Sequence, residues 1–116
     1  MPQFALLLPQ RADRYTSLTE DEFMPIMKDY IGWVEDAEAK GIFIGGHKLK
    51  EEGVTVRAPA GSVEVQDLLS TEVAEILGGL MIVEAPSMDA VIELAKSHPH
   101  LVHNDVIEIR PLDEDA

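Results

Sequence analysis

The stretch Leu80–Pro99, LMIVEAPSMDAVIELAKSHP, joins a strand pattern directly to a helix pattern and decides the fold class. Residues 80–85 are mostly apolar and favour a buried β-strand. Ser87 is a typical N-cap residue for a following helix. That helix would carry three apolar side chains on one face: Val91, Leu94 and Ala95. Pro99 disfavours its continuation, so the stretch predicts one strand-helix unit of an α+β domain.

The N-terminal part of the chain has the same strand-helix order. The apolar run Phe4–Leu8, FALLL, predicts a buried strand that is closed by Pro9. Further on, Thr19 is placed to cap a helix, and Glu22, three residues later, completes a capping box. Pro25 is awkward inside this helical pattern, so the helix either kinks there or starts anew near this residue.

The remaining segments supply the other strands. After Gly41, a candidate helix C-cap, residues 42–49 (IFIGGHKL) predict a strand with a glycine-rich middle. Residues 54–65 (VTVRAPAGSVEV) predict a hairpin whose turn contains proline and glycine. Residues 106–111 (VIEIRP) alternate apolar and polar side chains and predict a half-exposed final strand. The segment 70–77 (STEVAEIL) fits either a short helical turn or a loop.

The resulting order is strand, helix, strand, hairpin, strand, helix, strand. Two such halves with right-handed crossovers predict a ferredoxin-like α+β sandwich, in which two helices cover one face of an antiparallel sheet. Because the runs at 4–8 and 80–83 are apolar at consecutive positions, the other face of the sheet is apolar too. Soluble monomers rarely expose such a patch, so we expect a homodimer that packs sheet to sheet. Residues 1–112 are predicted to be one domain, and 113–116 an acidic tail.

The composition restricts the expected partners and location. The 116 residues include 22 acidic and 9 basic side chains, which gives a formal net charge of −13. Such a surface repels nucleic-acid phosphates and anionic membranes, so we expect neither partner. Without cysteine there is no disulfide framework and no thiolate nucleophile. The first apolar run is too short for a signal peptide or a membrane span, and we therefore expect a cytoplasmic protein.

Several segments, in this order and spacing, resemble the YCII-related family, in particular its DGPF-type branch. In that branch a V-x-D-G-P-F stretch leads through E-x-x-x-x-L-G-G into the next strand. Here Asp67 matches the aspartate, Leu68 and Leu69 replace the Gly-Pro, and Gly78 and Gly79 match the glycine pair. The segments that carry the resemblance are FALLLP at 4–9, AKGIFIGGHKL at 39–49, residues 63–99, and VIEIRPL at 106–112.

The resemblance implies a dimeric α+β barrel, and most members of the family have no established reaction. Enzymatic roles, including dehydrochlorination, are attributed to a few relatives. Some YCII-type members have a His–Asp pair proposed as catalytic, with the histidine early on the first helix. The corresponding position here is Tyr30. The mechanism proposed for that pair therefore does not transfer directly to this chain.

Five residues are candidates for a site. His47 follows two glycines, where the chain can approach a ligand, and is a candidate general acid/base; the alternative is a surface histidine. Asp67 is a candidate to orient or deprotonate His47, or else a turn aspartate. Tyr30 and Trp33 share one helix face, as core aromatics or as substrate contacts. Arg110 either binds a substrate carboxylate or pairs with a nearby glutamate.

Three of the four histidines, His98, His100 and His103, lie within six positions. Their spacing fits no single helix face, and Pro99 interrupts the helix between the first two. Four protein ligands are usual for structural zinc and three for catalytic zinc, and no motif here fixes either geometry. We expect His98 to lie at the frayed end of the helix and His100 and His103 on a turn that leads to the final strand, with no metal site and no cofactor.

These observations leave three hypotheses for the function. The first is a small acid/base enzyme that acts on a small organic molecule between the sheet and the helices. The second is a non-catalytic dimer that binds a metabolite or regulates a partner. The third is an oxygenase that handles haem or another substrate, as in the wider group of dimeric α+β barrels.

Overall fold

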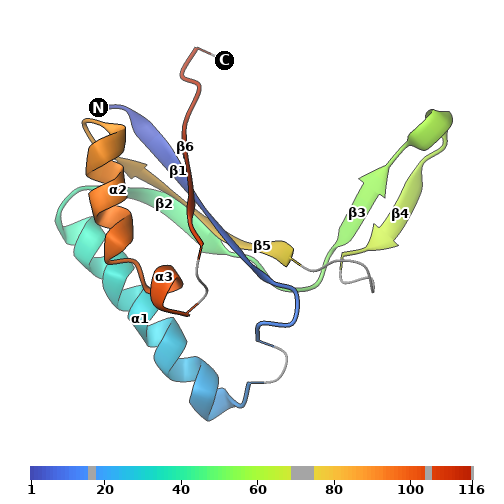
Figure 1. The fold of residues 1–116 in the computed structure, drawn as a ribbon, viewed down its shortest axis with the longest axis horizontal. Coiled ribbons are helices and arrows are strands. Elements are labelled where there is room, and N and C mark those ends of the chain that lie inside the picture. The colour runs from blue at the N-terminus through green and yellow to red at the C-terminus, as the bar shows by residue number, and fades with distance from the viewer. Residues whose placement is uncertain (16–17, 69–74, 104–105, 116) are drawn as a thin grey trace.

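In a computed structural model, the chain forms a four-stranded antiparallel sheet with helices on one face and a separate hairpin (Figure 1). The structure describes residues 1–15, 18–68, 75–103 and 106–115. The elements are β1 (Gln3–Arg11), α1 (Glu20–Ala39), β2 (Phe43–Lys48), β3 (Val54–Arg57), a 3-10 turn (Pro59–Gly61), β4 (Glu64–Asp67), β5 (Glu75–Glu84), α2 (Met88–Lys96), α3 (Pro99–His103) and β6 (Glu108–Pro111). The sheet order is β2-β5-β1-β6. The predicted ferredoxin-like α+β fold is confirmed.

The core lies between the sheet and the helices, and the central strands β1 and β5 supply most of it. Along β1 every second residue is buried, and Leu6 stands opposite Met81 on β5, as Phe4 stands opposite Val83. Aromatic side chains of α1 and apolar side chains of α2 pack against this face. Each fully buried side chain of this kind stabilises the fold by about 1.5–3 kcal/mol.

The predicted end of the first strand at Pro9 is wrong, because β1 continues through Pro9 to Arg11. Strand β6 accompanies β1 only as far as the pair Leu7–Glu108. Beyond that pair no β6 residue needs an N–H donor from β1, so the missing donor of Pro9 costs nothing there. The Pro9 carbonyl oxygen lies within hydrogen-bond distance of the His100 side chain.

The first helix begins as the sequence predicts. The Thr19 hydroxyl accepts a hydrogen bond from the Glu22 N–H at 3.2 Å, and the Glu22 carboxylate accepts one from the Thr19 N–H at 3.1 Å. The bonds from the Thr19 backbone and hydroxyl lower the pKa of the Glu22 carboxyl. Pro25 lies inside one continuous helix and starts no new one. Gly41 follows the helix end with a φ of +71°, the left-handed conformation that favours glycine.

The second helix also has its predicted cap, because the Ser87 hydroxyl accepts a hydrogen bond from the Ala90 N–H. The expectation of a frayed helix end at His98, followed by a turn, is wrong. Pro99 begins the short helix α3, a position where its missing N–H is harmless. His98 and His100 are only 0% and 2% exposed, and thus belong to the interior.

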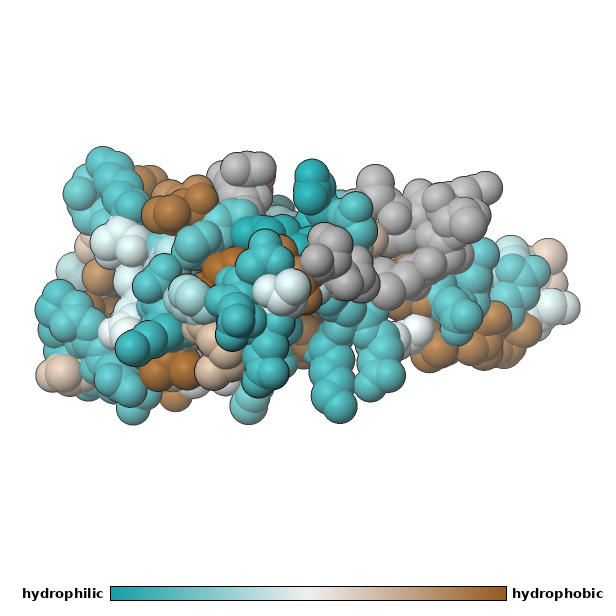
Figure 2. All heavy atoms as spheres, turned by 90° about the horizontal axis from the view of Figure 1, so that it is seen from below, coloured by the Kyte–Doolittle hydropathy of each residue, from teal (hydrophilic) through white to brown (hydrophobic). Residues whose placement is uncertain are grey.

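The predicted hairpin, β3 and β4, forms its own two-stranded sheet and projects away from the main sheet (Figure 1). Its valines are between 59% and 71% exposed and contribute to the apolar area at the right of Figure 2: Val54, Val56, Val63 and Val65. The radius of gyration is 16.2 Å. A compact chain of this length has about 13 Å, so this chain is unusually open. No helix in the described part of the chain is long and apolar enough to cross a membrane.

Candidate functional site

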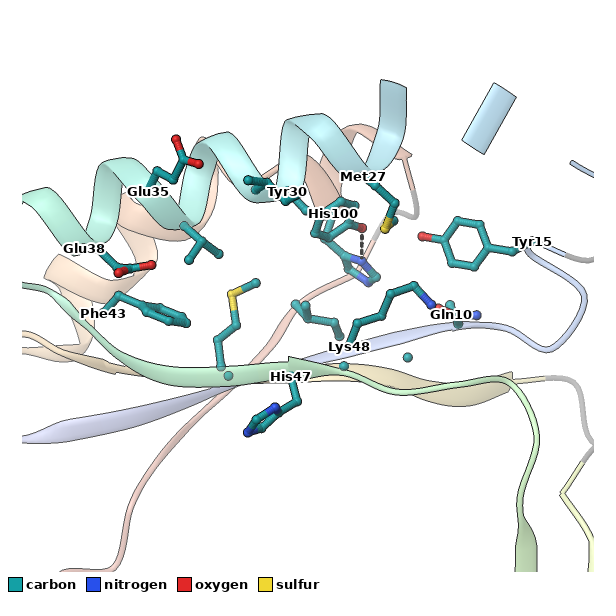
Figure 3. A pocket seen from close by; sticks show the side chains of 17 residues that line it. Gln10, Tyr15, Met27, Tyr30, Glu35, Glu38, Phe43, His47, Lys48 and His100 are labelled. Atoms are coloured by element: carbon teal, nitrogen blue, oxygen red, sulfur yellow. Dashed lines mark hydrogen bonds between the residues drawn. The ribbon is translucent and has the colours of Figure 1, made fainter. Parts of the chain in front are cut away.

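A pocket of about 410 Å³ lies between α1 and the sheet (Figure 3). Residues of β1, β2 and β5 form its floor, and α1 contributes its roof. Most of the lining is apolar and includes Leu8, Met27, Val34, Phe43 and Met81. Both the size and the apolar lining are typical of small-molecule sites.

Two positions on the sheet side of this pocket have no room for a side chain and are glycines. At Gly46 an added Cβ would lie 2.8 Å from the Leu80 carbonyl oxygen, a distance that real Cβ atoms do not adopt. At Gly78 it would lie 2.0 Å from the Gln10 side-chain oxygen, so the Gln10 amide occupies the space that a larger residue would need. The glycine pair of β5 coincides with a bulge, because Leu7 pairs with Leu80 whereas Pro9 pairs with Leu77.

The central polar feature of the pocket is a hydrogen-bonded pair, Tyr30 and His100. The Tyr30 hydroxyl lies 2.8 Å from His100 Nδ1, and His100 Nε2 lies 2.7 Å from the Pro9 carbonyl oxygen. A carbonyl only accepts, so Nε2 carries a proton. In the neutral imidazole Nδ1 is then the acceptor, and the Tyr30 hydroxyl donates to it. The phenol therefore has a basic nitrogen beside it.

His98 is hydrogen-bonded to the backbone of His100 and so helps to position this pair. Its Nδ1 accepts a hydrogen bond from the His100 backbone N–H at 3.0 Å, so Nε2 carries the proton and points at the Met81 sulfur, 3.3 Å away. Burial first, and the neighbouring His100 second, lower the pKa of His98 from 6.5 to about 4. His98 is thus a neutral, structural group at ordinary pH.

Helix α3 is also fastened at its far end. His103 Nε2 lies 3.0 Å from the Asp29 carboxylate on α1. The Arg14 guanidinium donates a hydrogen bond of 2.6 Å to the His103 carbonyl oxygen. These contacts tie α3 to α1 and to the segment after β1. They hold the helix that positions His100.

One end of the pocket is polar. In Figure 3 Tyr15, Gln10 and Lys48 lie together at this end, with the Tyr15 hydroxyl directed inward. The Gln10 amide donates a hydrogen bond of 3.3 Å to the Glu51 carboxylate, and Gln10 is buried. The Lys48 ammonium lies 5.0 Å from the centre of the Tyr15 ring, which places a cation at this end.

A family model, the YCII-related domain, matches residues 3–114. The chain belongs to the YCII-related family. The matched range includes every residue that lines the pocket. A search among curated proteins gives no match. The resemblance that the sequence motifs predict is therefore confirmed at the level of the family.

In this YCII-related protein the predicted acid/base pair is not brought together. His47 is exposed on β2, and its side chain points away from α1, on the far side of the sheet (Figure 3). It contributes to the pocket lining from that strand. Asp67 is exposed on β4 of the separate hairpin, opposite Val54. The two residues therefore belong to different sheets.

The three predicted substrate contacts have different positions in this YCII-related fold. Tyr30 lines the pocket. Trp33 packs against the core outside it: its indole N–H donates to the Ser97 hydroxyl at 3.1 Å, and its ring lies 4.4 Å from that of His98. Arg110 is exposed on β6 opposite Ala5, on the sheet face that the helices do not cover.

The sequence interpretation missed His100 and Lys48 as site residues of this family member. His100 and its partner Tyr30 lie 70 positions apart, so no local spacing predicts their contact. The available signal was Pro99 directly before His100, because proline is favoured at the first position of a helix and a short helix can therefore begin there. Among the described residues, no group of three histidine, aspartate or glutamate side chains is arranged to hold a metal ion.

Proposed function

We propose that this YCII-related protein is an acid/base enzyme that acts on a small organic molecule in the pocket under α1. The observation that carries the proposal is the 2.8 Å contact between the Tyr30 hydroxyl and His100 Nδ1, inside a largely apolar pocket. A positioned phenol with a basic nitrogen beside it is suited to general acid/base catalysis.

The proposed proton transfer involves the substrate, the Tyr30 hydroxyl and His100 Nδ1. His100 Nδ1 takes the phenolic proton, and the Tyr30 oxygen then accepts a proton from a carbon or heteroatom of the substrate. The imidazolium keeps its hydrogen bond to the Pro9 carbonyl, which stabilises its charge. Return of both protons regenerates the resting pair. The apolar lining strengthens these charge interactions, because few water molecules compete.

Replacement of Tyr30 tests the proposal. Wild-type protein in D2O is expected to accelerate exchange of carbon-bound protons for deuterium in members of a panel of small carbonyl compounds, followed by ¹H NMR. Tyr30→Phe removes the group that transfers the proton, and we expect the rate to fall by about 100-fold or more.

The control is Met24→Leu on the same helix, an exposed position outside the pocket lining, which is expected to keep the wild-type rate. Exchange in Tyr30→Phe at the wild-type rate would contradict the proposal, as would a wild-type protein that accelerates none of the compounds.

A non-catalytic, metabolite-binding dimer is the second candidate. It is favoured by the fact that Tyr30 and His100 also tie α1 to α3 and to β1, which is a structural role. A ligand that raises the melting temperature, with no proton exchange in any compound, would support this function.

We also propose that two copies pair through the sheet face that lacks helices, as the family's dimeric α+β barrel implies. Four apolar side chains occupy this face on the central strands: Ala5, Leu7, Leu80 and Ile82. All four are partly exposed in the protomer, and the open shape is consistent with a missing partner. Membership of the DGPF-type branch and a cytoplasmic location remain predictions from the sequence.

A charge on the proposed interface is expected to separate the copies. Leu80→Glu places a carboxylate in the middle of this face, where burial in a dimer would be costly. Light scattering during gel filtration should give twice 12.8 kDa for the wild type and 12.8 kDa for the variant. Ile92→Glu, an exposed position on α2, is the matched control and should remain dimeric. A wild-type mass of one chain would reject the dimer.

A further inference from the structure

Lys48 is held at the mouth of the pocket by its neighbours. It stands opposite Gly79 on β5, which has no side chain to displace the lysine stem. Its ammonium lies 5.0 Å from the ring centre of Tyr15 and 5.9 Å from that of Phe23. In Figure 3 the side chain runs along the floor toward Tyr15. Attraction between the cation and the two rings favours this position over free extension into solvent.

The charge of Lys48 has no carboxylate partner in the described structure. The ion pairs there use other cations: Arg11, Lys40, Lys50, Lys96 and His103. Lys48 donates one long hydrogen bond, 3.4 Å, to the Leu49 carbonyl, so an ammonium with three N–H groups retains donors for a ligand. The nearby Glu51 is engaged by Gln10. In a chain of net charge −13, an unmatched cation at a pocket mouth is suited to an incoming anion.

The opposite end of the pocket has the reverse character. Phe43, Ile31 and Val34 make it apolar, and the carboxylates of Glu35 and Glu38 belong to its rim on α1. An anionic group would be repelled at this end, whereas an apolar body would fit. In Figure 3 the Tyr30–His100 pair lies between the two ends.

We infer that the pocket binds a small organic anion with an apolar body, with its anionic group at Lys48 and its body directed toward Phe43. This inference rests on the proposed function for the site and names its substrate class. It places the carbon atoms next to the anionic group close to the Tyr30 hydroxyl.

Titration calorimetry with matched probes tests the charge requirement. Phenylacetate carries the anion, phenylacetamide is a neutral analogue of the same shape, and 2-phenylethylammonium carries the opposite charge. We expect phenylacetate to bind at least tenfold more tightly than either analogue, and its affinity to fall with added salt. Hexanoate and 4-methylpentanoate extend the test to aliphatic bodies.

A pair of lysine variants locates the anion. Lys48→Met keeps the length of the side chain and loses the charge, and we expect the affinity for the carboxylate probes to fall at least tenfold. Lys28→Met removes an exposed cation from α1 outside the pocket lining and should leave the affinity unchanged. Equal affinity in Lys48→Met, tighter binding of the ammonium probe, or no binding of any carboxylate at millimolar concentrations would overturn the inference.

The same variants separate this inference from the proposed catalysis. Lys48-dependent binding of carboxylates without proton exchange in any compound upholds the anion site and contradicts the enzyme. Proton exchange that needs Tyr30 and is unaffected by Lys48→Met upholds the enzyme and contradicts the anion site.

Discussion

Acidification from above pH 6.5 to about pH 4 is expected to lower the free energy of unfolding by up to about 3 kcal/mol through His98 alone. Burial lowers the pKa of this imidazole from 6.5 to about 4 in the folded protein. Between these values the unfolded chain binds the proton and the folded chain does not. The stabilising contribution is therefore complete above pH 6.5 and is lost as the pH falls toward 4.

Urea unfolding at a series of pH values measures this effect when the wild type is compared with His98→Asn. The asparagine oxygen can still accept from the His100 N–H but does not titrate, so the pH dependence should be flatter by about the same 3 kcal/mol. Val91→Ala, a cavity variant in the same core, should lose a similar free energy at every pH. An unchanged pH dependence in His98→Asn would show that His98 is not the group responsible.

Acid is expected to affect the site through the same residue. Protonation of His98 Nδ1 would place an N–H donor against the His100 N–H that this atom now accepts from. His98 also contacts α1, because the ring of Trp33 lies 4.4 Å from that of His98. The burial of His98 therefore couples the stability of the helix layer to the position of His100.

The parts of the fold that depend on neighbouring residues were predictable. The capping box of Thr19 and Glu22 and the cap at Ser87 each involve atoms within three positions along the chain. The strand β1 itself likewise follows from its own apolar run. The continuation of β1 past Pro9 was not predictable, because it depends on where β6 ends.

The arrangement of the site depends on a register shift in β2 that the sequence does not predict. In β2 Phe43 pairs with Val83, but Gly45, two residues on, pairs with Ile82, so Ile44 is an extra residue. Regular alternation from Phe43 would have placed His47 on the pocket face. The bulge reverses the following side chains, so that Lys48 enters the pocket and His47 faces away (Figure 3).

Tyr30 and His100 are expected to act as one unit in proton transfer. His100→Gln can still donate to the Pro9 carbonyl but offers no basic nitrogen to the phenol. Because the proton must pass through both groups, we expect His100→Gln to lose about as much exchange rate as Tyr30→Phe, about 100-fold or more. The double variant should lose no more than either single one.

Exchange rates of the four proteins, measured at a temperature at which all remain folded, give this comparison. Losses that multiply in the double variant would show that the two side chains act separately. Unfolding free energies of the same set isolate the structural share of the contact, for which neighbouring residues give a coupling of about 0.5–3 kcal/mol. A coupling in stability together with wild-type exchange rates in all three variants would make the 2.8 Å hydrogen bond a structural tie and would contradict the proposed proton transfer.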